Sequence, residues 1–245
     1  MKAFLACLGA AILQVCFGWT PASAEDLLPA NHNWSGIYVG GQIGGFWSNI
    51  DGRFVHTLGV DFNSGPSGGI GGAVLGFQRE LGPIVLGIEG DYLDTFDDNG
   101  SDTCHPSVGC VPGAMLQGKI SRMWTVGPRL GWDAGRWMPY ITGGYANAAI
   151  GSQSYVGGVP TDFSSNRFQG WYIGGGVDMA LSGNWKLGLE YRHYEFDDKT
   201  ITPTFNATGL PIPGDRWRLD PDADSVTARL TYVFGCEGDE PAPLK

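Results

Sequence analysis

The sequence has few of the features that mark the common enzyme classes. It contains four histidines, at positions 32, 56, 105 and 193, and none of them lies in a metal-ligand spacing such as HExxH. The full P-loop motif is absent, and the glycine-rich stretch at residues 68–72 is not followed by a helical pattern that would form a phosphate site. We therefore predict no cofactor and no metal.

Basic residues are also scarce. The chain has 15 Lys and Arg against 25 Asp and Glu, which gives a formal net charge of −10. Proteins that bind nucleic acid need clustered Lys and Arg to neutralise phosphates. The charge balance therefore argues against nucleic acid as a partner, although the acidic surplus does not itself identify one.

Beyond residue 24, no run of eighteen apolar residues occurs, which argues against a transmembrane helix. Residues 1–24 instead have the pattern of a secretory signal. Lys2 precedes an apolar stretch, and Ala22-Ser23-Ala24 fits a small-residue cleavage site. We predict cleavage before Glu25 and a periplasmic linker over residues 25–34; an uncleaved anchor is the alternative.

Cysteine is sparse, and two of the five residues, Cys7 and Cys16, lie in the predicted signal. Export leads to an oxidising compartment, where Cys104 and Cys110 form a candidate disulfide within one polar stretch. Two unpaired thiols are the alternative there. Cys236 has no evident partner and is either free or paired between chains.

Glycine is abundant, with 40 residues, and aromatic residues make up 12 % of the chain. Because disordered chains avoid aromatics, this glycine belongs to a folded protein. Apolar and other residues alternate with the period of a β-strand. The alternation occurs in eight runs: residues 36–47, 68–79, 84–93, 115–132, 137–151, 167–180, 185–196 and 225–234.

The connections between these runs alternate strictly in length. Residues 80–83, 133–136 and 181–184 are hairpin-length links with turn residues. Residues 49–67, 94–114, 152–166 and 197–224 are long and polar. The pattern predicts an all-β fold over residues 35–234: an eight-stranded, antiparallel, up-and-down transmembrane β-barrel with short periplasmic turns and four long extracellular loops.

A soluble β-sandwich would also alternate, but its solvent face would then carry an unusual amount of glycine. In a narrow barrel the same face becomes a crowded interior where glycine makes room and opposite charges pair. Pro128 and Pro139 oppose the barrel, because proline removes a ladder donor; we expect local bulges at both.

The two faces of the runs give two sets of candidate residues. One set is a lumen charge network: Glu89, Asp91, Arg129, Asp178, Lys186, Glu190, Arg192 and Arg229. The other is an aromatic girdle at the two membrane interfaces: Trp47, Trp124, Trp132, Trp171, Trp185, Tyr191, Tyr232 and Phe234.

Several segments resemble the opacity-protein-like, "porin family" outer-membrane β-barrels, which carry an OmpA-like transmembrane barrel. The segments are Asn33-Trp34-Ser35-Gly36-Ile37-Tyr38-Val39-Gly40-Gly41, Pro139-Tyr140-Ile141-Thr142-Gly143-Gly144, Gly170 to Asp178 and Asn184 to Tyr191. The resemblance implies a location in the Gram-negative cell outer membrane, surface exposure, and a role in envelope integrity or in contact with a host or the environment.

The last run, from Val226 to Phe234, resembles the C-terminal signal that the barrel-assembly machinery reads. The chain departs from that pattern because an acidic tail, residues 235–245, follows Phe234. We expect this tail to lie in the periplasm.

The leading functional hypothesis is a non-catalytic surface protein of the envelope, whose partners are outer-membrane lipid and lipopolysaccharide. The first alternative is an adhesin or ligand receptor acting through the long loops, and the second is a narrow, low-conductance pore. A lipid-modifying enzyme would have one candidate cluster, formed by His193, Glu195 and Glu190, although Glu190 points to the opposite face at strand spacing.

Overall fold

The computed structural model describes residues 34–54, 61–96, 101–103, 114–156, 159–181, 184–202, 204–205 and 216–235. Nearly all of them lie in β-strands, and within these ranges no helix is long and apolar enough to cross a membrane. The predicted signal, the cysteine pair Cys104 and Cys110, Cys236 and the rest of the acidic tail lie outside the described residues.

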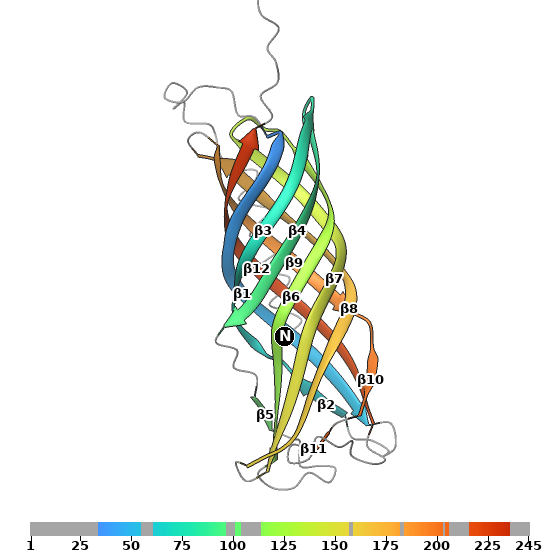
Figure 1. Ribbon diagram of the computed structural model, residues 1–245. Coiled ribbons are helices and arrows are strands. Elements are labelled where there is room, and N and C mark those ends of the chain that lie inside the picture. The colour runs from blue at the N-terminus through green and yellow to red at the C-terminus, as the bar shows by residue number, and fades with distance from the viewer. Residues whose placement is uncertain are drawn as a thin grey trace, which may run out of the picture. The chain divides into compact units, whose positions relative to one another are not determined.

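Eight long antiparallel strands form the barrel (Figure 1). Each pairs with its neighbour along the chain, and β12 pairs with both β9 and β1, so the sheet closes on itself and leaves no free edge. The strands are β1 (Gly36–Phe54), β3 (Ser67–Leu81), β4 (Ile84–Phe96), β6 (Ala114–Trp132), β7 (Trp137–Val156), β8 (Val159–Ala180), β9 (Trp185–Phe196) and β12 (Trp217–Gly235).

The two ends of the barrel differ. At one end, tight turns join β3 to β4 and β6 to β7, and each uses a glycine with a positive φ, Gly82 at 66° and Gly135 at 73°. At the other end the strands are extended by four short ones, seen at the lower end in Figure 1: β2 (Asp61–Ser64), β5 (Ser101–Thr103), β10 (Lys199–Ile201) and β11 (Thr204–Phe205).

Several strands are longer than the sequence predicts, and every extension of more than two residues lies at the end away from the tight turns. Residues 152–156 and 159–166, interpreted from sequence as loop, belong to β7 and β8 and pair with one another. Likewise β12 begins at Trp217, although the predicted run begins at residue 225. The extension of β12 carries Arg218, Asp220, Asp222 and Asp224 outward, so it lacks the apolar outer face by which the strands are recognised in sequence.

The expected bulges at the two prolines are wrong. Pro128 of β6 pairs with Ile88 of β4. On the other side of β6, the residues between Val126 and Arg129 do not pair with β7, but the register of β6 and β7 is the same before and after this gap. The register shift of that pair occurs farther along, between Ile120 and Arg122. Pro139 pairs with Val177 of β8 in unbroken register. The ladder therefore absorbs Pro128 by locally losing pairs, with Thr142 Oγ1 donating to the Pro128 carbonyl at 3.0 Å.

Along the half of the barrel near the tight turns, exposed and buried side chains alternate on most strands. In β9 the exposed residues are Trp185, Leu187, Leu189 and Tyr191, and the residues between them are buried. Because a closed single-layer barrel has only an outside and a lumen, the buried residues fill the lumen. The predicted inside-out arrangement, with apolar residues outside, is present here.

Candidate functional site: the lumen and the outer rim

All eight residues of the predicted lumen charge network are buried, with at most 5 % of any one exposed. Glu89 lies at the centre. Its carboxylate accepts from Arg192 Nη2 at 2.7 Å and from Arg229 Nη1 at 3.1 Å, and it also contacts Arg129 at 3.3 Å. Tyr38 donates its hydroxyl to the same carboxylate at 2.6 Å. One buried carboxylate thus holds three arginines from three different strands.

The other three carboxylates complete this network. Asp91 accepts from Arg192 Nη1 at 2.8 Å, and Glu190 accepts from Arg229 Nη1 at 3.0 Å. Asp178 pairs with Arg129. With Lys186, four cations face four anions, so the set has no formal net charge. Charges buried without compensation would cost several kcal/mol each, which explains why the set is balanced.

Neutral polar side chains join the network, and the sequence prediction did not include them. Tyr140 donates to Glu190 at 2.9 Å, and Gln42 Nε2 and Thr125 Oγ1 donate to Asp91 at 2.7 and 3.0 Å. The Arg129 guanidinium lies over the Tyr140 ring, 3.6 Å from its centroid. Tyr38 and Tyr140 lie at alternate strand positions that face the lumen. Their place in the alternation would therefore have identified them from the sequence.

Trp34 closes the lumen at the tight-turn end. It is fully buried, donates from Nε1 to Asp133 at 3.1 Å, and accepts from Gln78 Nε2 at its carbonyl at 2.6 Å. The ammonium of Lys186 lies 4.3 Å from its ring centroid. The sequence predicts Trp34 as the last residue of a periplasmic linker, but its side chain lies inside the barrel.

The chain turns into the lumen next to Gly36, whose φ of 142° is a conformation that side chains with a Cβ rarely adopt. A Cβ at this position would also lie 2.2 Å from the Phe234 carbonyl oxygen. Around Trp34 the interior is apolar, formed by Val85, Met138, Tyr140 and Ala180. The Trp34 side chain, two residues before β1, therefore fills the lumen at this end.

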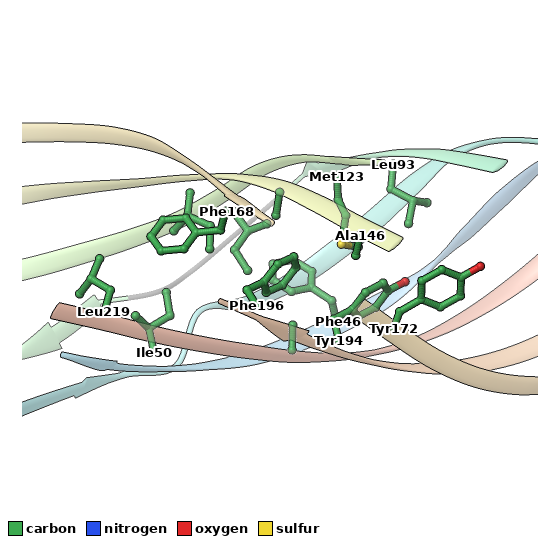
Figure 2. Close-up of a cluster of buried hydrophobic side chains, with 14 of the residues drawn as sticks. Phe46, Ile50, Leu93, Met123, Ala146, Phe168, Tyr172, Tyr194, Phe196 and Leu219 are labelled. Atoms are coloured by element: carbon green, nitrogen blue, oxygen red, sulfur yellow. The ribbon is translucent and has the colours of Figure 1, made fainter. Parts of the chain in front are cut away.

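The half of the lumen away from the tight turns is filled by apolar side chains rather than charges. Figure 2 shows this apolar cluster, to which all eight long strands contribute. Every member is at least 93 % buried. The cluster consists of Phe46, Ile50, Ile70, Leu93, Ile120, Met123, Ala146, Ala148, Ile150, Phe168, Tyr172, Tyr194, Phe196, Ile201, Leu219 and Ala223. The sequence predicts glycine and charge for the whole interior, and this apolar layer corrects that prediction.

Beside this apolar cluster the outer face changes character. On β8, Trp171 and Ile173 are exposed apolar residues, but Gln169 and Arg167 follow them on the same face. Six other long strands also have polar outward positions there, although on β4 the exposed Phe96 follows Asp94; the positions are Asn49, Asp51, Asp94, Arg122, Asn147, His193, Glu195, Asp220, Asp222 and Asp224. The barrel therefore has a belt of apolar outer surface and, beyond it, a polar outer rim around an apolar interior.

The eight predicted girdle aromatics face outward and border this belt on both sides. Trp132, Trp185, Tyr232 and Phe234 lie near the tight turns, where Trp185 and Tyr232 meet edge to face with ring centroids 5.2 Å apart. Trp47, Trp124, Trp171 and Tyr191 lie at the opposite border. Tyr92, Trp137 and Tyr145 are further exposed aromatics that the prediction omitted.

The candidate enzymatic cluster does not assemble as proposed from sequence. His193 and Glu195 face outward with their nearest atoms 3.8 Å apart, whereas Glu190 lies buried in the lumen. His193 Nδ1 lies instead 2.9 Å from Asp224 Oδ1, which also accepts from the Tyr191 hydroxyl at 2.6 Å. Among the described residues, neither ring nitrogen hydrogen-bonds a Ser, Thr or Cys that could act as a nucleophile.

Two further features of the described residues bear on catalysis. The string Gly65-Pro66-Ser67-Gly68-Gly69 has the spacing of a nucleophile elbow, but Ser67 begins strand β3 and no helix follows it. Within the described ranges, no group of three or more His, Cys, Asp or Glu is arranged to hold a metal ion.

Comparison with known proteins places these features in context. The model of a family described as "outer membrane protein beta-barrel domain" matches residues 10–234. The 25 kDa outer-membrane immunogenic protein of Brucella canis is 24 % identical over 215 residues, which cover 87 % of this chain and 85 % of its own. The 22 kDa outer membrane protein of Rhizobium leguminosarum bv. viciae is 28 % identical over 183 residues, 73 % and 71 % of the two chains.

A solved structure is also among those similar to this chain. The structure of OprG from Pseudomonas aeruginosa is 12 % identical, has a TM-score of 0.49, and aligns over 84 % of this chain and 98 % of its own.

Proposed function

The chain belongs to the outer-membrane protein β-barrel domain family and lies in the outer membrane, and from this premise we propose that it is a closed, non-catalytic barrel that presents its outer rim at the cell surface. In this role it contributes to envelope structure and to contact between the cell and its surroundings. The tight turns face the periplasm and the polar rim faces outward.

The observation that carries this proposal is the filled lumen. Trp34 lies at the periplasmic mouth, the charge network occupies the middle, and the apolar cluster occupies the outer half. Barrels of eight strands have interiors that side chains just fill. A path for ions would require several arginine–carboxylate contacts to break at once, and this argues against the pore alternative.

Single-channel recording of the refolded full chain in a planar bilayer tests the proposal. Heat-modifiable migration on a gel establishes beforehand that the barrel is folded. We expect no conductance above that of the bare bilayer. Discrete, reproducible current steps from the wild-type barrel would contradict the proposal and favour the pore.

A receptor or adhesin function remains the second candidate, and the projecting β7–β8 hairpin favours it. These strands pair with each other well beyond the apolar belt, out to Val156 and Val159. They therefore hold a paired, polar segment away from the membrane. The Brucella canis relative is named an immunogenic protein, which is consistent with a surface that host molecules reach.

Shortening this hairpin tests the adhesin function without opening the barrel. Gly151 and Ser165 are paired, so residues 152–164 can be replaced by a two-residue Asn-Gly turn that suits an antiparallel hairpin. An adhesin acting through this hairpin predicts that bacteria displaying the shortened chain adhere less to matrix-coated surfaces. Unchanged adhesion, with the shortened barrel still heat-modifiable, would exclude this hairpin as the contact.

The non-catalytic part of the proposal has its own test. Lipid A and phospholipid profiles of cells expressing wild type and His193→Ala should be identical by mass spectrometry. Asp224→Asn serves as the second variant, because it removes the carboxylate that would orient the histidine. A lipid species that disappears in both variants would identify an enzyme.

A further inference from the structure

Two arginines of the outer rim face outward on either side of a small residue. Arg122 of β6 pairs with Ala149 of β7, and Ala149 pairs with Arg167 of β8. Both arginines are exposed, and Ala149 is half-buried between them. The three residues thus form one row across three neighbouring strands.

The spacing of this row suits one small anion. Neighbouring strands are about 4.8 Å apart, so the two arginine backbones are separated by roughly 10 Å. Long guanidinium side chains leaning inward over the alanine methyl group can reach the same group from both sides. Arg forms bidentate hydrogen bonds to phosphate, which makes it the preferred residue for such a group.

A third cation lies near these strands but on the other face of the sheet. Lys199 of β10 donates from Nζ to the Arg167 carbonyl at 3.2 Å, and its ammonium lies 5.8 Å from the ring centroid of Phe168, which is buried in the lumen. The outward positive charge of the row therefore comes from Arg122 and Arg167.

The row lies directly above the outer border of the apolar belt. Trp124 is the next outward residue below Arg122, and Tyr145 and Trp171 lie two rows below Ala149 and Arg167. The rings of Trp124 and Tyr145 are in contact, with centroids 5.2 Å apart. Aromatic girdles mark the level of lipid headgroups, so the arginines lie at the depth where outer-leaflet phosphates are found.

No carboxylate neutralises the pair within the described part of the chain. Asp94 of β4 is the cross-strand neighbour of Arg122 and faces outward, yet it forms no ion pair with it. The outward carboxylates gather instead on β9, β12 and β1, where they form an acidic sector of the rim: Asp51, Glu195, Asp220, Asp222 and Asp224. Outward carboxylates are therefore more numerous on β9, β12 and β1, where Arg53 and Arg218 also face outward, than beside Arg122 and Arg167.

We propose that Arg122 and Arg167 bind a phosphate of an outer-leaflet glycolipid headgroup, with its acyl chains lying against the aromatic residues below. The site fixes one lipid of defined orientation on the β6–β8 side of the barrel. The proposal depends on the outer-membrane location and not on whether the lumen conducts.

Native mass spectrometry of the folded full chain in detergent, with added lipid A, tests this site. We expect the wild type to retain bis-phosphorylated lipid A and to release dephosphorylated lipid A much more readily. The double variant R122Q/R167Q should bind the phosphorylated form about a hundredfold more weakly, because each lost charge-assisted contact is worth about tenfold. Arg122→Lys with Arg167→Lys should recover part of the affinity.

Arg218→Gln is the matched control. This arginine faces outward on β12, in the acidic sector, where it pairs with Asp198 at 2.9 Å, and its loss changes net charge without touching the row. Heat-modifiable migration of each variant confirms folding. Equal binding of both forms of lipid A, equal binding by wild type and R122Q/R167Q, or complete displacement by inorganic phosphate would each overturn the proposal; the last result would indicate a site for free anions.

Discussion

Most long strands have an inner segment, near the tight turns, and an outer segment, beyond the apolar belt. In the inner segment the apolar side chains mainly face outward, and in the outer segment they mainly face the lumen. On β8, the inner segment carries Trp171 and Ile173 outside and Asp178 inside, whereas the outer segment carries Arg167 and Gln169 outside and Phe168 inside. The backbone and the pairing continue without a break from one segment to the other. Only the surrounding medium changes, from lipid to water, so it is the medium that determines which face is apolar.

The two segments also hold their interiors together by different interactions. In the membrane the lumen depends on balanced ion pairs, whose partners must all be present because any unpaired charge is buried. Outside the membrane the lumen is an ordinary apolar core, in which contributions scale with the area buried. Mutations of comparable size should therefore have different consequences in the two segments.

The largest effect is expected at the centre of the charged segment. Glu89→Gln leaves Arg129, Arg192 and Arg229 without their shared counter-charge. We expect the free energy of unfolding in lipid vesicles, measured by urea titration, to fall by roughly 3–5 kcal/mol. Glu195→Gln on the polar rim makes the same chemical change at a site 54 % exposed and should change it by less than about 0.5 kcal/mol. Equal losses would remove the distinction between the segments.

The second-largest difference between the two segments is expected when a charged residue is placed on the outer face of the barrel. Ile173 is 57 % exposed on the apolar belt, and Ile173→Arg should lower the free energy of unfolding by about 2–4 kcal/mol because the charge enters lipid. Gln169→Arg, two rows farther out on the same strand and face, should be nearly neutral. Similar costs at both positions would mean that the belt does not end between them.

The smallest informative effect comes from removing one methylene group. Ile120 is 3 % exposed in the apolar cluster, and Ile120→Val should cost about 0.5–1.5 kcal/mol through a small cavity. Ile43 is 61 % exposed on the belt, where lipid chains fill any gap, so Ile43→Val should cost less. If Ile120→Val costs nothing, the outer half of the lumen is loosely filled.

The sequence predicts the inner segments well. Apolar residues facing lipid and hairpin-length turns such as 133–136 create an alternation that identifies strands, their faces and the charges of the lumen. Glu89, Arg192 and Arg229 were assigned to the lumen from parity alone. Their mutual contacts could not be predicted, because these depend on strand stagger around the closed barrel.

The outer segments were largely missed for a physical reason. Residues 152–166 carry many Ser, Gly and other polar residues, which are equally typical of loops, so only backbone pairing shows that they continue the strands. The sequence did contain one indication of these segments. Phe168 and Ile150 are apolar residues at lumen-facing positions, whereas nearer the tight turns the lumen-facing positions carry glycine and charged residues. Trp34 was missed because no periodic pattern precedes the first strand.

Site-directed spin labelling along β8 tests the reversal of polarity most directly. Single cysteines at positions 167, 168, 169, 171, 172 and 173, in a chain whose Cys104, Cys110 and Cys236 are replaced by serine, report access to oxygen from lipid and to a nickel complex from water. We predict oxygen access at 171 and 173, nickel access at 167 and 169, and little of either at 168 and 172. Strong nickel access at 168 would show a hydrated outer lumen and contradict the account.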